Sequence, residues 1–573
     1  MTTFALTLHQ LRESLAELPQ RLRTSARVVR QTGLLYSLTL PGVRRAARAF
    51  ATGARNPSLV FEIHAANAPD KPALLWRDRR VTFGELDDRM NRAAVGLQRR
   101  GFRRNTSVVI LMRNRPEFIE VQGGASRLGA AAVSVSWRST AKELAYLAAH
   151  CGARALVFEA DLWPVVEQAR KDLPNIADRD CIAVGGEVPG CSRYEEDFLS
   201  APRPAFTVAR GVEEEAAVVI YTSGTTGKPK GAVRRFPKEA LQAVLQFIAE
   251  TPLRVDDVHL VTCPLYHSTA LGFLTMSGIL GATSVIMDEW KPEAFLQHVE
   301  RYGVTTTAMV PTMLHRVMAL GPEVLARYDT RSLRAIFSGG APLSGPLALA
   351  VMDHFGDVLF NFYGATETGL VTLAKPADLR AAPGTIGKAV PGNTIRLLGE
   401  SGDEVAPGLV GELYARNKML VAGYHNDDGA TRSSMNGGFF SVGDLARRDP
   451  EGRYFIEGRK RDMIISGGVN VYPAEIEGVL EAHPDLAEVA VVGVEDAEWG
   501  ERVRAFVVRR PGSDVDEAAL LLWCRERLSG PKVPREYVFL EALPRNPTGK
   551  VLKRDLRTLS SGGGHRAGDQ PGG

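Results

Sequence analysis

The segment Thr222 to Gly231, TSGTTGKPKG, gathers hydroxyl, glycine and lysine residues within ten positions. Hydroxyls, ammonium groups and backbone N–H groups hold anions, and glycine lets the backbone approach them closely. The composition therefore predicts a phosphate-binding loop. A Walker A loop reads G-x-x-x-x-G-K-[ST] and opens a helix, whereas here two residues separate Gly224 from Gly227 and Pro229 follows Lys228. We expect this loop to wrap around its phosphate groups.

Six further motifs carry groups suited to nucleotide and carboxylate chemistry. Taken singly, each has a plainer interpretation, because a lone histidine is usually structural, a turn glutamate is usually solvated and a loop lysine usually lies at the surface. Their order along the chain makes the chemical interpretation the stronger one. The motifs are PLYHS at 264–268, SGGAP at 338–342, YGATE at 363–367, the segment from Asp444 to Arg459, SGGVN at 466–470 and PTGK at 547–550.

In this order, the motifs resemble those of the adenylate-forming superfamily, which includes acyl-CoA synthetases, luciferases and the adenylation domains of peptide synthetases. The resemblance covers roughly residues 60–557. It implies that a carboxylic acid attacks ATP to give acyl-AMP and pyrophosphate, with Mg²⁺ as the metal, and that CoA then takes the acyl group as a thioester. The loop at 222–231 would hold the β- and γ-phosphates that leave as pyrophosphate.

The resemblance also assigns four catalytic roles. Lys550 would bridge the acyl carboxylate and the α-phosphate, where a cation offsets the charge of the two reacting anions. His267 would lie near the acyl carboxylate, and Thr366 near the α-phosphate. Glu367 would bind Mg²⁺, which prefers one or two carboxylates combined with phosphate oxygens.

The remaining assignments concern the nucleotide, CoA and a hinge. Asp444 and Arg459 match the ribose ligands, and Arg461 falls at the hinge, where most relatives carry Asp or Lys. Val469 stands where many acyl-CoA ligases have Glu. The expected ATP-binding residues are Thr222, Ser223, Gly224, Thr225, Thr226, Gly227, Lys228, Lys230, Gly339, Gly340, Ala341, Pro342, Tyr363, Gly364, Asp444 and Arg459, and the expected CoA-binding residues are Ser466, Gly467 and Gly468.

Composition places the chain among ordinary globular proteins. It has 573 residues, of which 45% are hydrophobic and 24% charged, so more than one domain is expected. The longest apolar stretch, about 271–287, is interrupted by glycine, serine and threonine and predicts buried core, since it is too short to cross a membrane. Five scattered cysteines without a CxxC pair favour a reduced, cytoplasmic setting.

Charge is distributed unevenly along the chain. Residues 1–58 carry nine arginines, no lysine and two acidic residues, a net charge of +7, which leaves −3 for the other 515 residues. No basic surface is therefore expected for nucleic acid. Apolar residues between Phe4 and Leu22 recur at steps of four and three, which predicts an amphipathic helix. Three interpretations stay open: helices packed on the body, a membrane anchor formed by residues 1–50 at the inner face, and a cleaved transit peptide.

The elements that must position these motifs form an α/β pattern. Short buried runs such as 106–112, 155–159, 216–222, 258–264, 283–287, 305–311, 334–340 and 357–364 alternate with helix-length segments such as 83–100 and 141–149. This alternation predicts doubly wound sheets. After residue 393, short strands with polar boundaries predict a small β-rich subdomain, and 474–556 a compact α+β unit.

These observations predict four regions and one activity. The regions are a basic extension at 1–58, a large adenylation domain at 59–460, a mobile lid domain at 461–557 and a disordered tail at 558–573. The predicted activity is that of an AMP-forming acyl-CoA synthetase acting on a medium- or long-chain fatty acid. The alternatives are an acyl-AMP ligase that loads a carrier protein and a membrane-associated fatty-acid uptake protein, and a homodimer is also left open.

Overall fold

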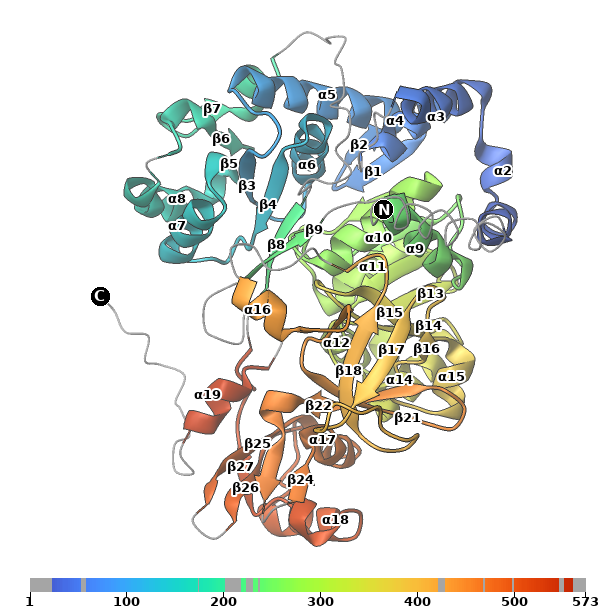
Figure 1. Ribbon diagram of the computed structural model, residues 1–573, viewed down its shortest axis with the longest axis vertical. Helices are drawn as coiled ribbons and strands as arrows, with labels where there is room; N and C mark the ends of the chain where they lie inside the picture. Colours follow the sequence, from blue (N-terminus) through green and yellow to red (C-terminus); the bar gives the residue numbers. More distant parts are fainter. Residues whose placement is uncertain are drawn as a thin grey trace, which may run out of the picture.

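A computed structural model describes residues 23–52, 58–173, 175–200, 218–222, 230–234, 238–420, 428–466, 469–496, 499–545 and 551–559 (Figure 1). No helix among these residues is long and apolar enough to span a bilayer. The expected fold class is confirmed, because two large α/β sheets form the body and a small α+β unit follows at the C-terminal end.

The first large sheet has the strand order β7-β6-β5-β3-β4-β8-β9 among the described residues. All neighbours are parallel except the β8–β9 pair. Parallel strands need crossover connections, and α6 (Pro116–Leu128), α7 (Ala141–His150) and α8 (Trp163–Ala169) lie in those between β3, β4, β5 and β6. Its strands are β3 (Ser107–Leu111), β4 (Ala131–Val135), β5 (Ala153–Glu159), β6 (Cys181–Val184), β7 (Ser192–Arg193), β8 (Val218–Thr222) and β9 (Lys230–Arg234).

The second large sheet has the order β16-β15-β14-β13-β12-β10-β11-β1-β2 within the described part of the chain. Its central strands from β14 to β1 are parallel, whereas β2, β15 and β16 join antiparallel at the two edges. Its strands are β1 (Pro72–Trp76), β2 (Arg79–Thr82), β10 (Val258–Val261), β11 (Thr283–Ile286), β12 (Thr306–Met309), β13 (Ala335–Ser338), β14 (Leu359–Ala365), β15 (Gly369–Ala374) and β16 (Lys388–Ala389).

Two smaller sheets follow along the chain. An antiparallel sheet contains β17 (Thr394–Leu398), β18 (Gly411–Arg416), β19 (Met435–Asn436), β20 (Phe439–Phe440), β21 (Asp444–Arg448) and β22 (Tyr454–Arg459). The C-terminal unit, called the lid below, contains β23 (Ile464–Ser466), β24 (Val469–Val471), β25 (Leu486–Asp496), β26 (Gly500–Arg509) and β27 (Glu536–Phe539). Figure 1 shows the lid at the end of the molecule opposite α5.

The helices fill the crossovers and the N-terminal region. Threonine N-caps with a glutamate three residues later form capping boxes at the starts of α5 and α7, as their sequences favour. Residues 23–32 are also helical. The labelled helices of four or more residues are α2 (Leu34–Ser37), α3 (Leu40–Thr52), α4 (Leu59–Asn67), α5 (Phe83–Arg99), α6 (Pro116–Leu128), α7 (Ala141–His150), α8 (Trp163–Ala169), α9 (Lys238–Ala249), α10 (Ser268–Leu280), α11 (Pro292–Tyr302), α12 (Pro311–Met318), α13 (Pro322–Leu325), α14 (Gly345–Phe355), α15 (Pro376–Ala381), α16 (Asp428–Ser433), α17 (Pro473–Glu481), α18 (Glu517–Arg525) and α19 (Lys553–Thr558).

The N-terminal residues that the structure describes pack on the body. Val28 is 1% exposed and belongs to the apolar cluster around Phe247 and Phe273. Gln31 donates a hydrogen bond to the carbonyl of Ile248 (2.8 Å), and the backbone N–H of Val255 donates to Thr32 (3.0 Å). Residues 28–32 thus pack on the body, as the first of the three interpretations expects, while the stripe from Phe4 to Leu22 lies outside the described residues.

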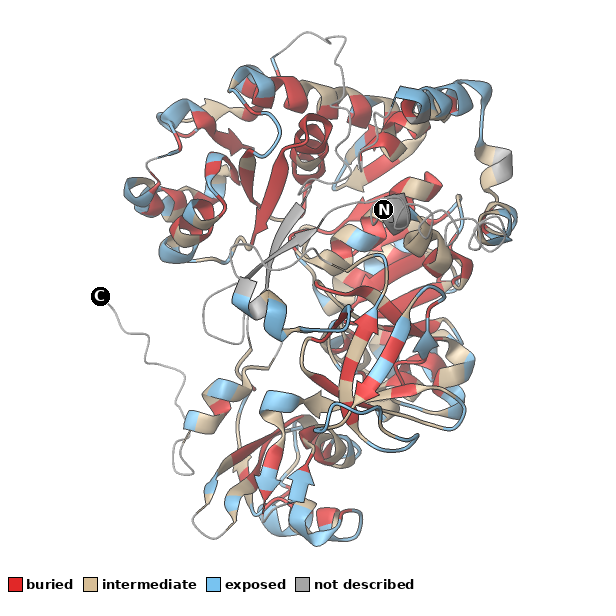
Figure 2. Ribbon diagram, viewed as in Figure 1, coloured by how far each residue is buried: buried red, intermediate tan, exposed pale blue. Residues whose placement is uncertain are grey.

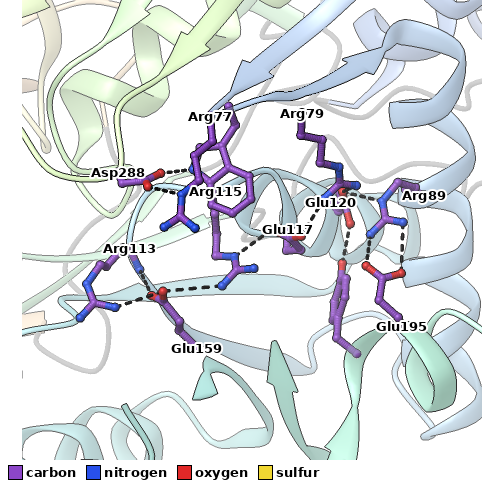
Figure 3. Close-up of polar contacts among 12 residues, drawn as sticks. Arg77, Arg79, Arg89, Arg113, Arg115, Glu117, Glu120, Glu159, Glu195 and Asp288 are labelled. Carbon is purple, nitrogen blue, oxygen red and sulfur yellow. Dashed lines mark hydrogen bonds and ion pairs between the residues drawn. The ribbon is translucent and has the colours of Figure 1, made fainter. Parts of the chain in front are cut away.

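A network of ion pairs fastens the two large sheets to each other (Figure 3). Arg79 of β2 contacts Glu117 of α6 at 2.9 Å, and so crosses from the second sheet to the first. Arg115 pairs with the same Glu117 at 2.8 Å and lies 3.6 Å from Glu159 at the end of β5. The arginines lower the pKa of Glu117, which burial alone would raise. The network therefore holds the two sheets in one fixed arrangement.

Candidate active site

Three of the sequence motifs meet at one edge of the second sheet. Strands β10, β12, β13 and β14 are parallel neighbours, so their carboxyl ends lie on the same side. PLYHS follows β10, SGGAP follows β13, and YGATE spans the end of β14. The carboxyl edge of a parallel sheet is the usual ligand-binding position in α/β folds. The topology therefore gathers motifs that are about 100 residues apart in sequence.

Tyr363, Asp444 and Arg459 form one connected group. The Tyr363 hydroxyl donates to the Asp444 carboxylate at 2.8 Å, and Arg459 Nε lies 3.2 Å from the other carboxylate oxygen. Asp444 and Arg459 are register partners in β21 and β22. Burial, and next the Asp444 charge, raise the pKa of Tyr363 well above its ordinary value, which keeps the phenol protonated as a donor. The predicted ribose ligands and the predicted adenine residue are thus brought together.

Removing the Asp444 carboxylate should weaken ATP binding more than removing the tyrosine hydroxyl. Asp444→Ala leaves both Tyr363 and Arg459 without this partner, so a loss of about 10- to 100-fold in ATP affinity is expected, because unpaired buried groups cost about 1–3 kcal/mol. Tyr363→Phe keeps the ring and deletes one hydrogen bond, and it should cost tenfold or less. Titration calorimetry with ATP measures both variants. Wild-type affinity in Asp444→Ala would contradict this assignment.

Two glycines of the site occupy positions that no other residue could take without strain. Gly340 has φ 81°, a left-handed conformation. A Cβ at Gly364 would lie 2.0 Å from the carbonyl oxygen of Gly369, which is a backbone atom and cannot move aside cheaply. Gly364 also lies at the irregularity in the β14–β15 pairing, next to Tyr363. These glycines explain how the backbone passes close to the proposed nucleotide position. Gly339, Ala341 and Pro342 lie in the same turn.

Thr366 and Glu367 lie at the turn between β14 and β15. The Thr366 hydroxyl is 3.3 Å from that of Ser268, the first residue of α10, so PLYHS and YGATE are in contact. Glu367 is 6% exposed. The described residues hold no group of three or more His, Cys, Asp or Glu side chains that could form a metal site alone. A single carboxylate fits Mg²⁺ that takes its other ligands from phosphate oxygens and water.

His267 is the N-cap residue of α10. A residue that follows strand β3 of the first sheet holds its segment in place. Asn114, just after β3, donates to the Cys263 carbonyl (3.0 Å) and accepts from the Leu265 N–H (2.7 Å), which fixes the PLYHS segment. Burial lowers the pKa of His267 to about 4. Among the described residues its Nε2 atom has no hydrogen-bond partner, and its ring packs 4.4 Å from that of Tyr266. His267 is therefore a neutral group at pH 7.

The neutral state of His267 leads to a prediction about the pH dependence of activity. Because the pKa of His267 is about 4, its charge should not change between pH 6 and pH 9, and no limb of the activity profile in that range should belong to it. His267→Asn should lower kcat/KM and leave the shape of the profile unchanged. Steady-state rates over this range for both proteins measure the effect. A limb near pH 6.5 that is present in the wild type and lost in the variant would refute the assignment.

Several predicted residues lie outside the described part of the chain. Thr222 and Lys230 are register partners at the ends of β8 and β9, so residues 223–229 connect the two strands. These two strands form the end of the first sheet that is nearer the second sheet in the view of Figure 1. The predicted residues outside the described ranges are Ser223, Gly224, Thr225, Thr226, Gly227, Lys228, Gly467, Gly468 and Lys550.

Arg461 lies between residues anchored on opposite sides. On the body side, the Lys460 N–H donates to the Gly443 carbonyl (2.8 Å), and its ammonium pairs with Glu412 (2.9 Å). On the lid side, Asp462 pairs with Arg557 of α19 at 3.0 Å. Arg461 Nε approaches no closer than 3.9 Å to the Asp462 carboxylate. The position predicted as the hinge is thus the link between the body and the lid.

The strands on either side of the predicted CoA loop lie away from those on either side of the predicted phosphate loop. Ser466 ends β23 and Val469 begins β24, and in Figure 1 β24 lies beside α18 at the far side of the lid from β8 and β9. Ser466 is 3% exposed, whereas Ile465 and Val469 on either side are 51% and 41% exposed. A CoA thiol held by this loop would meet the acyl-adenylate only after the lid moves.

Sequence reasoning missed two supporting asparagines. Asn114 fixes PLYHS as described above. Asn417 donates to the Thr368 carbonyl (2.9 Å) and to the Asn393 side chain (2.7 Å), and so supports the turn that carries Glu367. Both partners are distant in sequence, so neither contact leaves a local pattern. The one available signal was an asparagine directly after a buried strand in the case of Asn114.

Comparison with known proteins shows which family these features belong to. The model of the AMP-binding enzymes matches residues 61–425, and that of their C-terminal domain matches residues 475–550. The chain belongs to the adenylate-forming AMP-binding enzymes. This places it among AMP-forming acid–thiol ligases.

The chain matches individual relatives over nearly the whole of their length. An indoleacetate–CoA ligase of Aromatoleum aromaticum is 35% identical over 87% of this chain and 96% of its own. A fatty acid–[acyl-carrier-protein] ligase of Streptomyces coeruleorubidus is 33% identical over 86% and 94%. The crystal structure of an anthranilate CoA ligase in complex with anthranoyl-AMP superposes with a TM-score of 0.81 at 26% identity, over 88% of this chain and 97% of that one.

Proposed function

We propose that the protein activates an apolar carboxylic acid, specifically a medium- or long-chain fatty acid, as its acyl-adenylate and transfers the acyl group to CoA. The observation that carries the proposal is the meeting of three motifs at one sheet edge: Ser268 contacts Thr366, and Tyr363 joins the Asp444–Arg459 pair. The proposed domain bounds are 59–460 for the adenylation domain and 461–557 for the lid. The proposed location is the cytoplasm.

In the first half-reaction, an oxygen of the acid attacks the α-phosphorus of ATP, and pyrophosphate leaves. Asp444 and Arg459 would hold the ribose hydroxyls as acceptor and donor, Tyr363 would stack on adenine, and Gly339 to Pro342 would line it. Glu367 would hold Mg²⁺, which supplies charge neutralisation at the phosphates. The neutral His267 at the start of α10 would stand beside the carboxylate, with Thr366 near the α-phosphate.

In the second half-reaction, the CoA sulfur attacks the acyl carbonyl carbon, the thiol proton is lost, and AMP leaves with the mixed-anhydride oxygen. Because β24, which follows the predicted CoA loop, lies at the far side of the lid from β8 and β9 in Figure 1, this step would follow rotation of the lid about Arg461. Rotation would withdraw Lys550 and bring Ser466 to Gly468 to the acyl-adenylate. A different face of the lid would therefore meet the active site in each half-reaction.

The fatty-acid assignment rests on the small residues of α10. Gly278 packs against Phe61 of α4, since a Cβ there would be 3.1 Å from the ring, and Ala270 is 3% exposed. A Cβ at Gly272, in contrast, would meet nothing within 4 Å. Gly278 is therefore a helix-packing contact, whereas Gly272 is exposed, so the open space beside it lies at the protein surface, and we propose that an acyl tail enters there.

Two relatives suggest the competing outcomes. The indoleacetate–CoA ligase acts on an aromatic acid, and the Streptomyces enzyme loads a carrier protein. Acyl-CoA formation is therefore to be measured by mass spectrometry with acetate, octanoate, palmitate, indoleacetate and anthranilate, each offered with CoA or with a phosphopantetheinylated carrier protein. The proposal expects palmitate or octanoate with CoA to give the highest kcat/KM. Preference for an aromatic acid or for the carrier would overturn that part of it.

A further inference from the structure

The N-terminal extension exposes large apolar side chains, which soluble proteins usually bury or replace with polar ones. The large apolar residues that are at least 40% exposed in the described chain include Leu38 (40%), Leu40 (63%) and Val43 (47%), three within six positions. Of the others, Ile465 and Val469 lie on the paired strands β23 and β24 of the lid, and the rest are separate from one another in sequence. The family matches begin at residue 61, so this cluster belongs to a part of the chain outside the shared enzyme.

Helical geometry sorts the residues of α3 into a buried face and an outer face. At 100° per residue, Leu40, Val43 and Ala47 fall within one arc of about 60°. Gly42 and Ala49 fall on the opposite side and are buried, and a Cβ at Gly42 would overlap the side chain of Asn67. The outer face is exposed over most of its length in Figure 2. We call Leu40, Val43 and Ala47, with Arg44 and Arg48 beside them, the α3 outer face.

Contacts with the body prevent α3 from rotating about its own axis, so Leu40 on the outer face stays exposed. The Thr39 N–H donates to the Asn67 side chain at 3.0 Å. Arg45, on the side of α3 toward α4, pairs with the buried Glu62 at 2.6 Å. α4 in turn contacts α10, where His64 Nε2 lies 3.1 Å from the Ile279 carbonyl oxygen. The outer face is therefore held rigidly on the helix pair that leads to the proposed acyl site.

The chemistry of the α3 outer face matches an anionic lipid surface. Arg44 and Arg48 are exposed at the border of the apolar stripe, and α3 contains no acidic residue. An apolar stripe flanked by arginines is the pattern of helices that lie in the headgroup region of a bilayer. A symmetric contact with a second copy would instead bring arginine against arginine, and its small apolar area falls short of the ~800 Å² per partner of a stable interface.

We propose that the α3 outer face docks the enzyme on the surface of an anionic bilayer. Leu40 and Val43 enter the boundary between headgroups and acyl chains, and Arg44 and Arg48 contact phosphate oxygens. The contact narrows the expected membrane-binding region from residues 1–50 to one helix face. This docking deepens the proposed function. One consequence rests on that function: acids that partition into the bilayer would be presented next to α4 and α10.

The test is co-flotation of the full-length protein with phosphatidylcholine vesicles that contain or lack phosphatidylglycerol, without ATP or acid. Binding to the anionic vesicles alone is expected, and it should fall as salt rises. Leu40→Asp with Val43→Asp should abolish it, and Arg44→Gln with Arg48→Gln should lower the partition coefficient about 30-fold. Since neither ATP nor acid is present, failure of this binding and failure of the ligase reaction are separate results.

Matched controls make the test specific. Leu409→Asp with Leu522→Asp changes two side chains that are 59% and 61% exposed in the body and the lid. Arg99→Gln with Arg103→Gln removes two exposed charges at the end of α5. Both control proteins should bind vesicles like the wild type. Equal binding of the α3 variants and the wild type would overturn the proposal, as would a dimer in solution that the Leu40→Asp, Val43→Asp protein loses.

Discussion

Replacing Lys550 with alanine is expected to slow acyl-adenylate formation by about 10²–10³-fold, the usual cost of deleting a donor that stabilises transition-state charge. Lys550 itself lies outside the described residues, but its neighbours place the motif on the lid. Arg545 and Val551 form an antiparallel bridge, and Lys553 pairs with Glu477 at 2.6 Å. The described positions on either side of residue 550 are therefore fixed to the lid, and we propose that Lys550 assists the first half-reaction and withdraws with the lid before the second.

The two half-reactions are measured separately on this variant. Pyrophosphate exchange into ATP reports the first, and single-turnover thioester formation from supplied acyl-AMP and CoA reports the second, which should be largely spared. Lys550→Arg should restore part of the exchange because it keeps the charge. Lys532→Ala removes another lid lysine, one paired with Glu475, and should leave the exchange unchanged. If the Lys550→Ala protein is equally impaired with supplied adenylate, the assignment of Lys550 is wrong.

The second large effect is expected at Arg461. Proline at this position fixes φ near −65° between Lys460, which is tied to the body, and Asp462, which is tied to the lid. In the present arrangement Arg461 is the second residue of the short helical turn Lys460–Asp462, a place where proline is tolerated. The variant should therefore make acyl-AMP at nearly the wild-type rate and lose thioester formation about 10²-fold or more.

Arg461→Ala is the control for the hinge, because it removes the guanidinium and leaves the backbone free to rotate. Both half-reactions should stay close to wild type in this protein. The paired assays used for Lys550 apply without change. Equal losses in both half-reactions of Arg461→Pro would show that rotation does not pivot here.

Much of the fold follows from local patterns in the sequence. The buried runs before the motifs predicted β3, β5, β8, β10, β11, β12, β13 and β14, because continuous apolar segments bounded by turn residues are typical of parallel strands covered on both faces. The compact α+β unit predicted at 474–556 is observed, with β25 and β26 as its long strands and α18 at Glu517–Arg525. The antiparallel edge strands β2 and β16 were not foreseen, since they are short and partly exposed and leave a weaker pattern. Strand β15, which is mostly buried, was not foreseen either.

In the candidate site, too, some residues were predicted from the sequence and others were not. The order of motifs predicted Tyr363, Asp444 and Arg459 as one group, and the structure brings them together. What sequence could not predict is contact between distant side chains, such as Asn114 with the PLYHS segment. The sequence also could not show that the absence of a side chain at Gly278 serves the packing of α10 on α4.

Acid-dependent exchange of labelled pyrophosphate into ATP tests the central claim most directly, because it requires reversible acyl-adenylate formation and neither CoA nor lid rotation. The account predicts exchange that needs Mg²⁺ and an apolar carboxylic acid, that Asp444→Ala weakens through ATP affinity, and that stops when the acid is omitted. Purified wild-type protein that binds ATP but exchanges no pyrophosphate with any acid of the series would contradict it.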